Sequence, residues 1–122
     1  MAKTALVVDD SVTIRQMVSF TLTEAGFEVL LGSDGAEGLS HLNGRRVDLI
    51  VTDINMPVMD GFDMIRQARA REAYRFTPIL VLTTESKDSR KLEGKQAGAT
   101  GWIVKPFNPQ QLKQVVSKVV PA

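Results

Sequence analysis

Five polar residues scattered along the chain have side chains suited to phosphoryl transfer: Asp9, Asp10, Asp53, Thr83 and Lys105. Carboxylates held close together repel one another and raise at least one pKa, and a hard divalent cation such as Mg²⁺ removes that conflict. A lysine can pair with an anionic phosphoryl oxygen, and a threonine hydroxyl can bond another. An aspartate among such groups can attack phosphorus and become an acyl phosphate, and we expect Asp53 to be that nucleophile.

Each of these residues on its own has an ordinary structural explanation. An aspartate after a strand is commonly a turn or cap residue, a lone lysine is commonly solvated, and a threonine commonly ends a strand. In this chain, however, four of the five residues come where a different apolar run ends. Four coincident strand ends favour the functional interpretation.

The apolar runs that would carry these residues have the length of strands. They cover residues 5–8, 27–31, 47–53, 78–83 and 101–104. Most lack the alternation of a half-exposed strand, which indicates burial on both faces, as in a parallel sheet. The run 27–31 alternates in part, so we expect it at an edge of the sheet.

Helical periodicity fills the segments between the runs. From Ile14 to Ala25 apolar residues recur at three- and four-residue spacing, with Thr13 and Gln16 as a capping box and Gly26 as the stop. Further helices are predicted over residues 35–42, closing near Asn43-Gly44, and over residues 60–68, 86–97 and 109–119. Asn108 and Pro109 have the chemistry of a cap followed by the first helical residue.

Strands and helices that alternate five times through short connections predict one α/β domain over residues 1–122. We expect a doubly wound, five-stranded parallel sheet with helices on both faces, joined by right-handed crossovers. The carboxyl ends of all strands in such a sheet lie at one edge, where ligands bind. The five polar residues should therefore meet there.

Composition excludes several classes of function. Fifteen basic and fourteen acidic residues give a net charge of +1, which predicts no attraction to nucleic acid or to a membrane surface. The absence of cysteine excludes disulfides and thiolate metal sites. The first apolar run is too short for a signal peptide or a membrane span. We expect a cytoplasmic monomer without membrane insertion.

The motifs around the polar residues resemble those of response-regulator receiver domains. The matching segments are Val8-Asp9-Asp10-Ser11, Asp53-Ile54-Asn55-Met56-Pro57, Asp60-Gly61, Leu82-Thr83-Thr84-Glu85 and Lys105-Pro106-Phe107. They span nearly the whole chain and are highly specific as a set, and the pattern is most similar to the stand-alone chemotaxis members. The resemblance implies a flavodoxin-like fold with strand order 2-1-3-4-5, and a phosphoacceptor signalling protein without a separate output domain.

The same resemblance implies a role for each acidic residue. Asp53 would be the phosphoacceptor, which receives its phosphoryl group from a histidine kinase of the chemotaxis type. Asp10 would bind Mg²⁺ directly and Asp9 mainly through water. Asp53 itself and the backbone carbonyl of Asn55 would complete the protein ligands.

The resemblance also implies a switch. Lys105 would contact the phosphoryl group, and its bond to Pro106 is expected to be cis. Thr83 would move toward the phosphoryl group after transfer, and Trp102 would rotate into the space that Thr83 leaves. Tyrosine or phenylalanine is commoner at that position. The bulkier indole, with a donor but no acceptor, could instead be a fixed packing residue.

Two further residues and one surface complete the implied function. Asn55 and Glu85 would tune the attack of water on the acyl phosphate, and their match to the chemotaxis pattern predicts a short-lived phosphoryl group. The switched face would comprise the helix 86–97, the strand 101–104 and the last helix. It would bind a flagellar motor switch protein or another target, and the basic helix 86–97 would suit an acidic partner.

Two other functions remain open. A phosphorelay intermediate or phosphate sink would share the chemistry and pass the group to a histidine phosphotransfer domain or discard it. A phosphatase with an aspartyl nucleophile is less favoured, because such enzymes usually place a second aspartate two residues after the nucleophile. This chain has Asn55 there.

Overall fold

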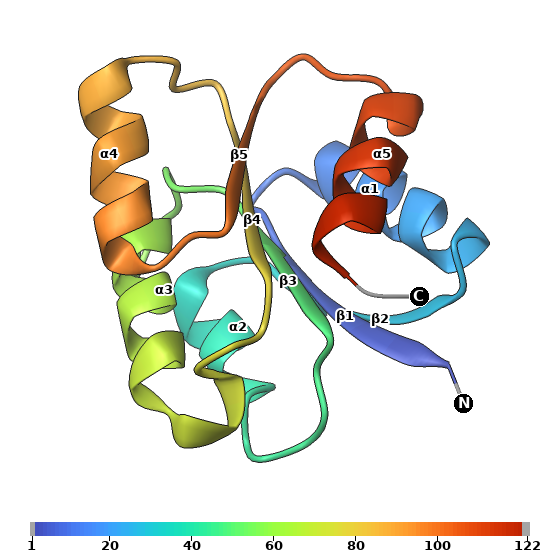
Figure 1. The fold of residues 1–122 in the computed structure, drawn as a ribbon, viewed down its shortest axis with the longest axis horizontal. Helices are drawn as coiled ribbons and strands as arrows, with labels where there is room; N and C mark the ends of the chain where they lie inside the picture. The colour runs from blue at the N-terminus through green and yellow to red at the C-terminus, as the bar shows by residue number, and fades with distance from the viewer. Residues whose placement is uncertain (1, 121–122) are drawn as a thin grey trace.

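The computed structural model describes residues 2–120 and shows strands and helices alternating along the chain (Figure 1). The elements are β1 (Lys3–Val8), α1 (Val12–Glu24), β2 (Phe27–Gly32), α2 (Gly35–Ser40), β3 (Leu49–Thr52), α3 (Gly61–Ala70), a 3₁₀ turn (Glu72–Tyr74), β4 (Ile79–Thr83), α4 (Asp88–Ala97), β5 (Gly101–Val104) and α5 (Pro109–Val119). The predicted α/β alternation is confirmed.

All five strands pair in parallel, in the order β2-β1-β3-β4-β5. This order confirms the doubly wound arrangement and places β2 at an edge. Every residue of β3 and of β4 is buried. Burial on both faces explains why these strands read as unbroken apolar runs and not as alternating ones.

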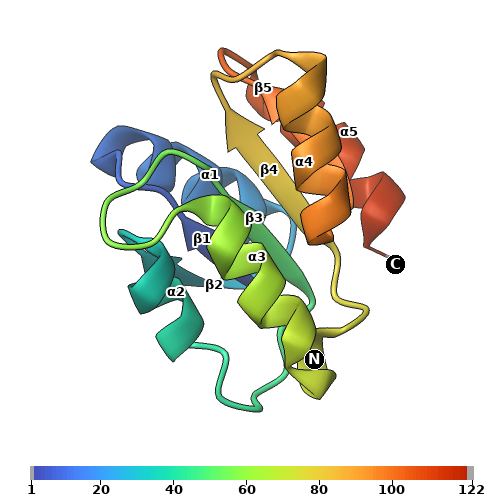
Figure 2. The ribbon, with the colours of Figure 1, turned by 90° about the vertical axis from the view of Figure 1, so that its left-hand side faces the viewer.

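Two hydrophobic cores flank the sheet, because successive side chains of a strand point to opposite faces. Leu6 and Val8 of β1 pack in the core under α2, α3 and α4, whereas Ala5 and Val7 pack in the core under α1 and α5. Figure 1 shows α1 and α5 together on one side of the sheet, and Figure 2 shows α2, α3 and α4 on the other.

Strand register determines which residues meet at the carboxyl-terminal edge. Val8 of β1 lies opposite Thr52 of β3, so the next residues, Asp9 and Asp53, emerge side by side. Thr83 of β4 lies opposite Val104 of β5, so Lys105 follows directly beside the end of β4. The sheet thus delivers residues from distant parts of the sequence to one place.

The start of α1 differs from the prediction. Ser11, not Thr13, is the N-cap, and its Oγ accepts a hydrogen bond from the Ile14 N–H at 3.3 Å. Ser11 has extended backbone angles, so its side chain can reach back to the first turn, whereas Thr13 already lies inside the helix. Gly26, with φ of 97°, follows the helix as predicted.

Two predicted helix bounds also need correction, and one short element was not predicted. Helix α2 ends at Ser40, although Leu42 beyond it is still buried, and α4 begins at Asp88, two residues later than expected. The 3₁₀ turn was not predicted; it buries Tyr74, whose hydroxyl donates to the Arg45 carbonyl and accepts from the Gly44 N–H.

Within residues 2–120, no helix has the length and apolar character that crossing a bilayer requires.

The capping box of α5 yields a first prediction. The Asn108 side chain accepts from the Gln111 N–H at 2.9 Å, and the Gln111 side chain accepts from the Asn108 N–H at 2.9 Å. Asn108→Ala should lower the free energy of unfolding by about 1 kcal/mol, because a helix-end donor loses its partner. Urea unfolding followed by circular dichroism measures it, with Gln110→Ala as the control. Equal stability of the two variants would contradict the role of the cap.

Candidate functional site

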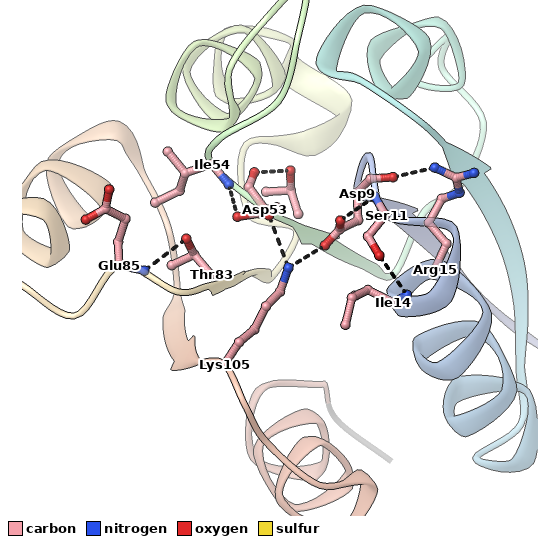
Figure 3. Close-up of polar contacts among 10 residues, drawn as sticks. Asp9, Ser11, Ile14, Arg15, Asp53, Ile54, Thr83, Glu85 and Lys105 are labelled. Atoms are coloured by element: carbon pink, nitrogen blue, oxygen red, sulfur yellow. Dashed lines mark hydrogen bonds and ion pairs between the residues drawn. The ribbon is translucent and has the colours of Figure 1, made fainter.

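The ammonium of Lys105 lies between two carboxylates at the carboxyl-terminal edge of the sheet (Figure 3). Its Nζ is 2.9 Å from Asp9 Oδ2 and 3.1 Å from Asp53 Oδ2. The backbone N–H of Lys105 donates to the Thr83 carbonyl at 2.8 Å, which extends the β4–β5 pairing to the lysine. The Lys105–Pro106 peptide bond is cis.

Burial and pairing act in opposite directions on the pKa of Lys105. Removal from water disfavours the ammonium, but the hydrogen bond to Asp9 and the negative charges of Asp53 and Asp9 outweigh that penalty. The pKa of Lys105 is therefore raised, and the lysine stays charged.

Asp9 is almost completely buried, and its burial raises the pKa of the carboxyl group. The Lys105 ammonium and the Ser11 N–H, which donates to Asp9 Oδ1 at 2.9 Å, oppose that rise, whereas the neighbouring charge of Asp53 adds to it. A nearby cation therefore stabilises the charged form of the Asp9 carboxylate.

Asp53 is held from both sides. Its Oδ1 accepts from the Ile54 N–H at 2.6 Å, and its Oδ2 faces Lys105. Gly61, the first residue of α3, packs so closely on the Asp53 carbonyl that a Cβ atom at that position would collide with it. The start of α3 is thereby pressed against the backbone of Asp53, and only glycine allows this approach.

Asp9, Asp10 and Asp53 form an acidic group in which each residue offers one carboxylate oxygen within 4.8 Å of the other two. Asp10 is exposed, whereas the other two are buried. An all-oxygen donor set with carboxylates and access to water matches the preference of Mg²⁺. Among residues 2–120, this is the one group of acidic or imidazole side chains with spacing that suits a metal ion.

Thr83 and Trp102 are linked through the backbone of Glu85. The buried Thr83 Oγ1 accepts from the Glu85 N–H at 3.3 Å, and Trp102 Nε1 donates to the Glu85 carbonyl at 2.9 Å. A displacement of the Thr83 hydroxyl would therefore act on the same residue, Glu85, whose carbonyl holds the indole.

The indole of Trp102 is seated against α3 and α4. It stacks on Phe62 with ring centroids 6.3 Å apart, and the guanidinium of Arg90 lies 4.7 Å from the centroid of the Phe62 ring. Gly94 provides the space: a Cβ there would lie 2.6 Å from Trp102 Cζ3. Absence of a side chain at position 94 thus accommodates an aromatic group larger than tyrosine.

The structure brings together Asp9, Asp10, Asp53 and Lys105. Asn55 is exposed in the loop after Asp53, and the role expected for its backbone carbonyl stays a prediction. Sequence reasoning missed Gly94 and Arg15, and it named Gly61 only as part of a motif. Arg15 donates to the Asp9 carbonyl at 2.6 Å (Figure 3). The roles of the two glycines follow from tertiary contacts, of Gly61 with the Asp53 backbone and of Gly94 with the Trp102 indole.

Comparison with known proteins agrees with this geometry. A family model described as the response regulator receiver domain matches residues 5–117. The chemotaxis protein CheY of Pseudomonas aeruginosa is 39% identical over 115 residues, which cover 93% of both chains. The structure of the chemotaxis response regulator CheY4 of Vibrio cholerae is 50% identical, with a TM-score of 0.93, covering 98% of this chain and 100% of that one.

A second similar structure bears on the acidic group. The receiver domain of a sensor histidine kinase from Pseudomonas aeruginosa is 28% identical, with a TM-score of 0.89 over 98% of each chain, and was solved with a magnesium ion coordinated in its active-site cleft. The chain therefore belongs to the response regulator receiver domain family, whose members act in two-component signalling and not as conventional enzymes.

Proposed function

We propose that the protein accepts a phosphoryl group from a histidine kinase on Asp53, in a Mg²⁺-dependent reaction, and then binds a chemotaxis target such as a flagellar motor switch protein. The observation that carries the proposal is the convergence of Asp53, Lys105 and the acidic pair Asp9 and Asp10 at one edge of the sheet. Such a set can orient a phosphoryl group and neutralise its charge.

In the proposed transfer, a carboxylate oxygen of Asp53 attacks phosphorus as the bond from phosphorus to the donor imidazole breaks. The imidazole keeps the electron pair of that bond and takes up a proton, and Asp53 becomes an acyl phosphate. Asp9, Asp10, Asp53 and the backbone carbonyl of Asn55 would hold Mg²⁺, which supplies positive charge to the phosphoryl oxygens. Lys105 exchanges a carboxylate partner for a phosphoryl oxygen.

The donor has access to the site beside Lys105. A hollow of about 350 Å³, lined mainly by apolar groups of Ile14, Met17, Pro106 and Phe107, borders the lysine. Thr84 lies at its rim. A kinase segment that carries its phosphohistidine can pack apolar side chains there while the imidazole reaches Asp53.

The conformational change would pass from Thr83 through Glu85 to the surface beside Trp102. Thr83 turns its hydroxyl to the new phosphoryl group and releases the Glu85 N–H, which shifts the loop that Trp102 bonds. The surface beside Trp102 has a hollow of about 320 Å³ lined by Lys91 and Lys95. Two lysines next to an aromatic ring suit an acidic partner segment. Asn55 and Glu85 would set the lifetime of the acyl phosphate, which we expect to be short.

The first test is the acceptor. The native protein incubated with phosphoramidate and Mg²⁺ should gain one phosphoryl group, detected by intact-protein mass spectrometry, and Asp53→Asn should gain none because it lacks the nucleophile. Asp88→Asn, an exposed aspartate at the start of α4, is the matched control and should react like the native protein. Phosphorylation of Asp53→Asn to the native extent would refute the acceptor.

The same pair of proteins tests the output. Beryllofluoride with Mg²⁺ stands in for the phosphoryl group and should increase binding of the native protein to a motor-switch peptide, with no effect on Asp53→Asn. Transfer of the phosphoryl group to a histidine phosphotransfer domain, without binding of the peptide, would instead identify a phosphorelay intermediate.

A second prediction concerns the seat of Trp102. Gly94→Ala should displace the indole, because the new methyl group would overlap it, and the hydrogen bond to Glu85 should be lost. The fluorescence of the single tryptophan should then shift to longer wavelength and become easier to quench with acrylamide. Gln96→Ala, on the exposed face of α4, is the control.

In the native protein, beryllofluoride with Mg²⁺ should change the Trp102 spectrum, and in Asp53→Asn it should not. An unchanged native spectrum at saturation would make Trp102 a fixed packing residue and remove it from the switch.

A third prediction follows from the charge of Lys105. Its pKa is raised from 10.5 in the folded state, so its stabilising contribution is complete below that value and is lost as the pH rises through the folded-state pKa. The free energy of unfolding of the native protein minus that of Lys105→Met should stay constant from about pH 8 to 10. Above about pH 10.5 this difference should decrease, because the native protein loses the contribution of the charged lysine.

Urea unfolding at each pH measures that difference. Lys91→Met, which removes an exposed lysine, is the control for general effects of alkaline solution. A difference that does not depend on pH would show that Lys105 makes no ionic contribution to stability.

A further inference from the structure

We propose that Arg15 is a positioning residue of the phosphorylation site: its guanidinium holds the backbone carbonyl of Asp9 and so fixes the turn that presents Asp9 and Asp10. This inference rests on the proposed function of the acidic group. It assigns a role in Mg²⁺ binding to a residue that makes no direct contact with the carboxylate oxygens in the structure.

The need for such a residue arises where the sheet ends. The Val8 carbonyl still accepts from the Asp53 N–H at 3.0 Å, and the Asp9 N–H still donates to the Gly32 carbonyl at 3.1 Å. The pairing of β1 with β2 and with β3 ends here, so neither strand offers a donor to the Asp9 carbonyl. Asp9 is 2% exposed, so water is a poor substitute, and an unpaired buried carbonyl is costly.

Arg15 supplies the missing donor from the first turn of α1. Its guanidinium Nη1 donates to the Asp9 carbonyl at 2.6 Å, six residues back along the chain (Figure 3). Its own backbone N–H donates to the Ser11 carbonyl at 3.0 Å, which anchors the arginine in the helix. The side chain therefore ties the rigid helix to the residue that precedes the turn.

With this contact, every polar group of Asp9 is bonded. Besides the two backbone bonds, Oδ1 accepts from the Ser11 N–H at 2.9 Å and Oδ2 faces Lys105 at 2.9 Å. Asp10 is the opposite case, since it is exposed and no contact holds its carboxylate. The direction of the Asp10 side chain therefore depends on the backbone between Asp9 and Ser11, one end of which Arg15 holds.

A looser turn should weaken the metal site more than it weakens the fold. Only one donor contact would be lost on removal of the guanidinium, whereas the three carboxylates must stay within a few ångströms to share one cation. Side chains that orient metal ligands typically change metal affinity by about 10- to 100-fold when they are removed.

The test measures Mg²⁺ itself by isothermal titration calorimetry on the native protein and on Arg15→Gln, Arg15→Lys and Gln16→Ala. Arg15→Gln should raise the dissociation constant about 10-fold, and Arg15→Lys should give an intermediate value because one ammonium replaces the fork of the guanidinium. Gln16→Ala, which changes an exposed neighbour on the same helix, should bind Mg²⁺ like the native protein.

Phosphorylation by phosphoramidate provides a second readout. At low Mg²⁺ the Arg15→Gln protein should react more slowly than the native protein, and saturating Mg²⁺ should restore the rate, because the nucleophile and Lys105 are intact. If Arg15→Gln does not fold, Arg15→Lys decides the question: it should bind Mg²⁺ more weakly than Gln16→Ala.

A purely structural arginine would give another result. Arg15→Gln would then melt at a lower temperature by circular dichroism but bind Mg²⁺ with native affinity, which would overturn the inference. The proposed function fails separately, and visibly, if the native protein itself neither binds Mg²⁺ nor takes up a phosphoryl group.

Discussion

The contact of one ammonium group with two carboxylates is the interaction on which this edge of the molecule depends. Asp9 and Asp53 are both buried, and burying two negative charges side by side is unfavourable without a cation. Lys105 offsets the repulsion between the two carboxylates, because it follows β5 at the edge of the sheet where Asp9 follows β1 and Asp53 follows β3. An incoming phosphoryl group offers the same lysine a different anionic partner, so the contact that stabilises the resting protein also prepares it for reaction.

Much of the fold was predictable because the signals were local. Unbroken apolar runs indicated buried strands, and Gly26 and Asn108 marked helix ends through their own backbone and side-chain chemistry. The alternation of elements then placed the ends of the strands at one edge, which was enough to nominate Asp9, Asp53 and Lys105. The order of the strands was different: it came from the resemblance to receiver domains, because strand order depends on contacts between segments far apart in sequence.

The structural roles that sequence reasoning missed depend on contacts that no local pattern shows. Ser11, and not the predicted Thr13, caps α1, because the position where the chain leaves β1 decides which hydroxyl faces the first turn of the helix. Gly61 is needed for its approach to the Asp53 backbone, and Gly94 for the volume of an indole. In the sequence, Gly94 lies within a helical pattern and looks like a weak position, whereas Gly61 belongs to the Asp60-Gly61 motif. The contacts of each glycine in the fold explain its role.

Gly94 also explains how the protein accommodates a tryptophan at position 102. The indole of Trp102 is larger than the ring of tyrosine or phenylalanine and would overlap a side chain on α4. Here α4 lacks a side chain at the point of contact, and Phe62 extends the stacked surface. The large residue and the missing one compensate in volume, so the indole can lie inward and bond Glu85.

The register between β1 and β3 divides the molecule into an edge that is intolerant of insertions and one that is tolerant. Val8 and Thr52 are paired, so one extra residue in either strand would move an aspartate along the ladder and turn its side chain to the other face. The opposite edge carries the connections that lead into the strands, such as the exposed residues 25–26, where a Cβ built on Gly26 would meet no neighbouring atom. Peptide tags or grafted loops therefore belong there, where added length leaves the alignment of the two aspartates untouched.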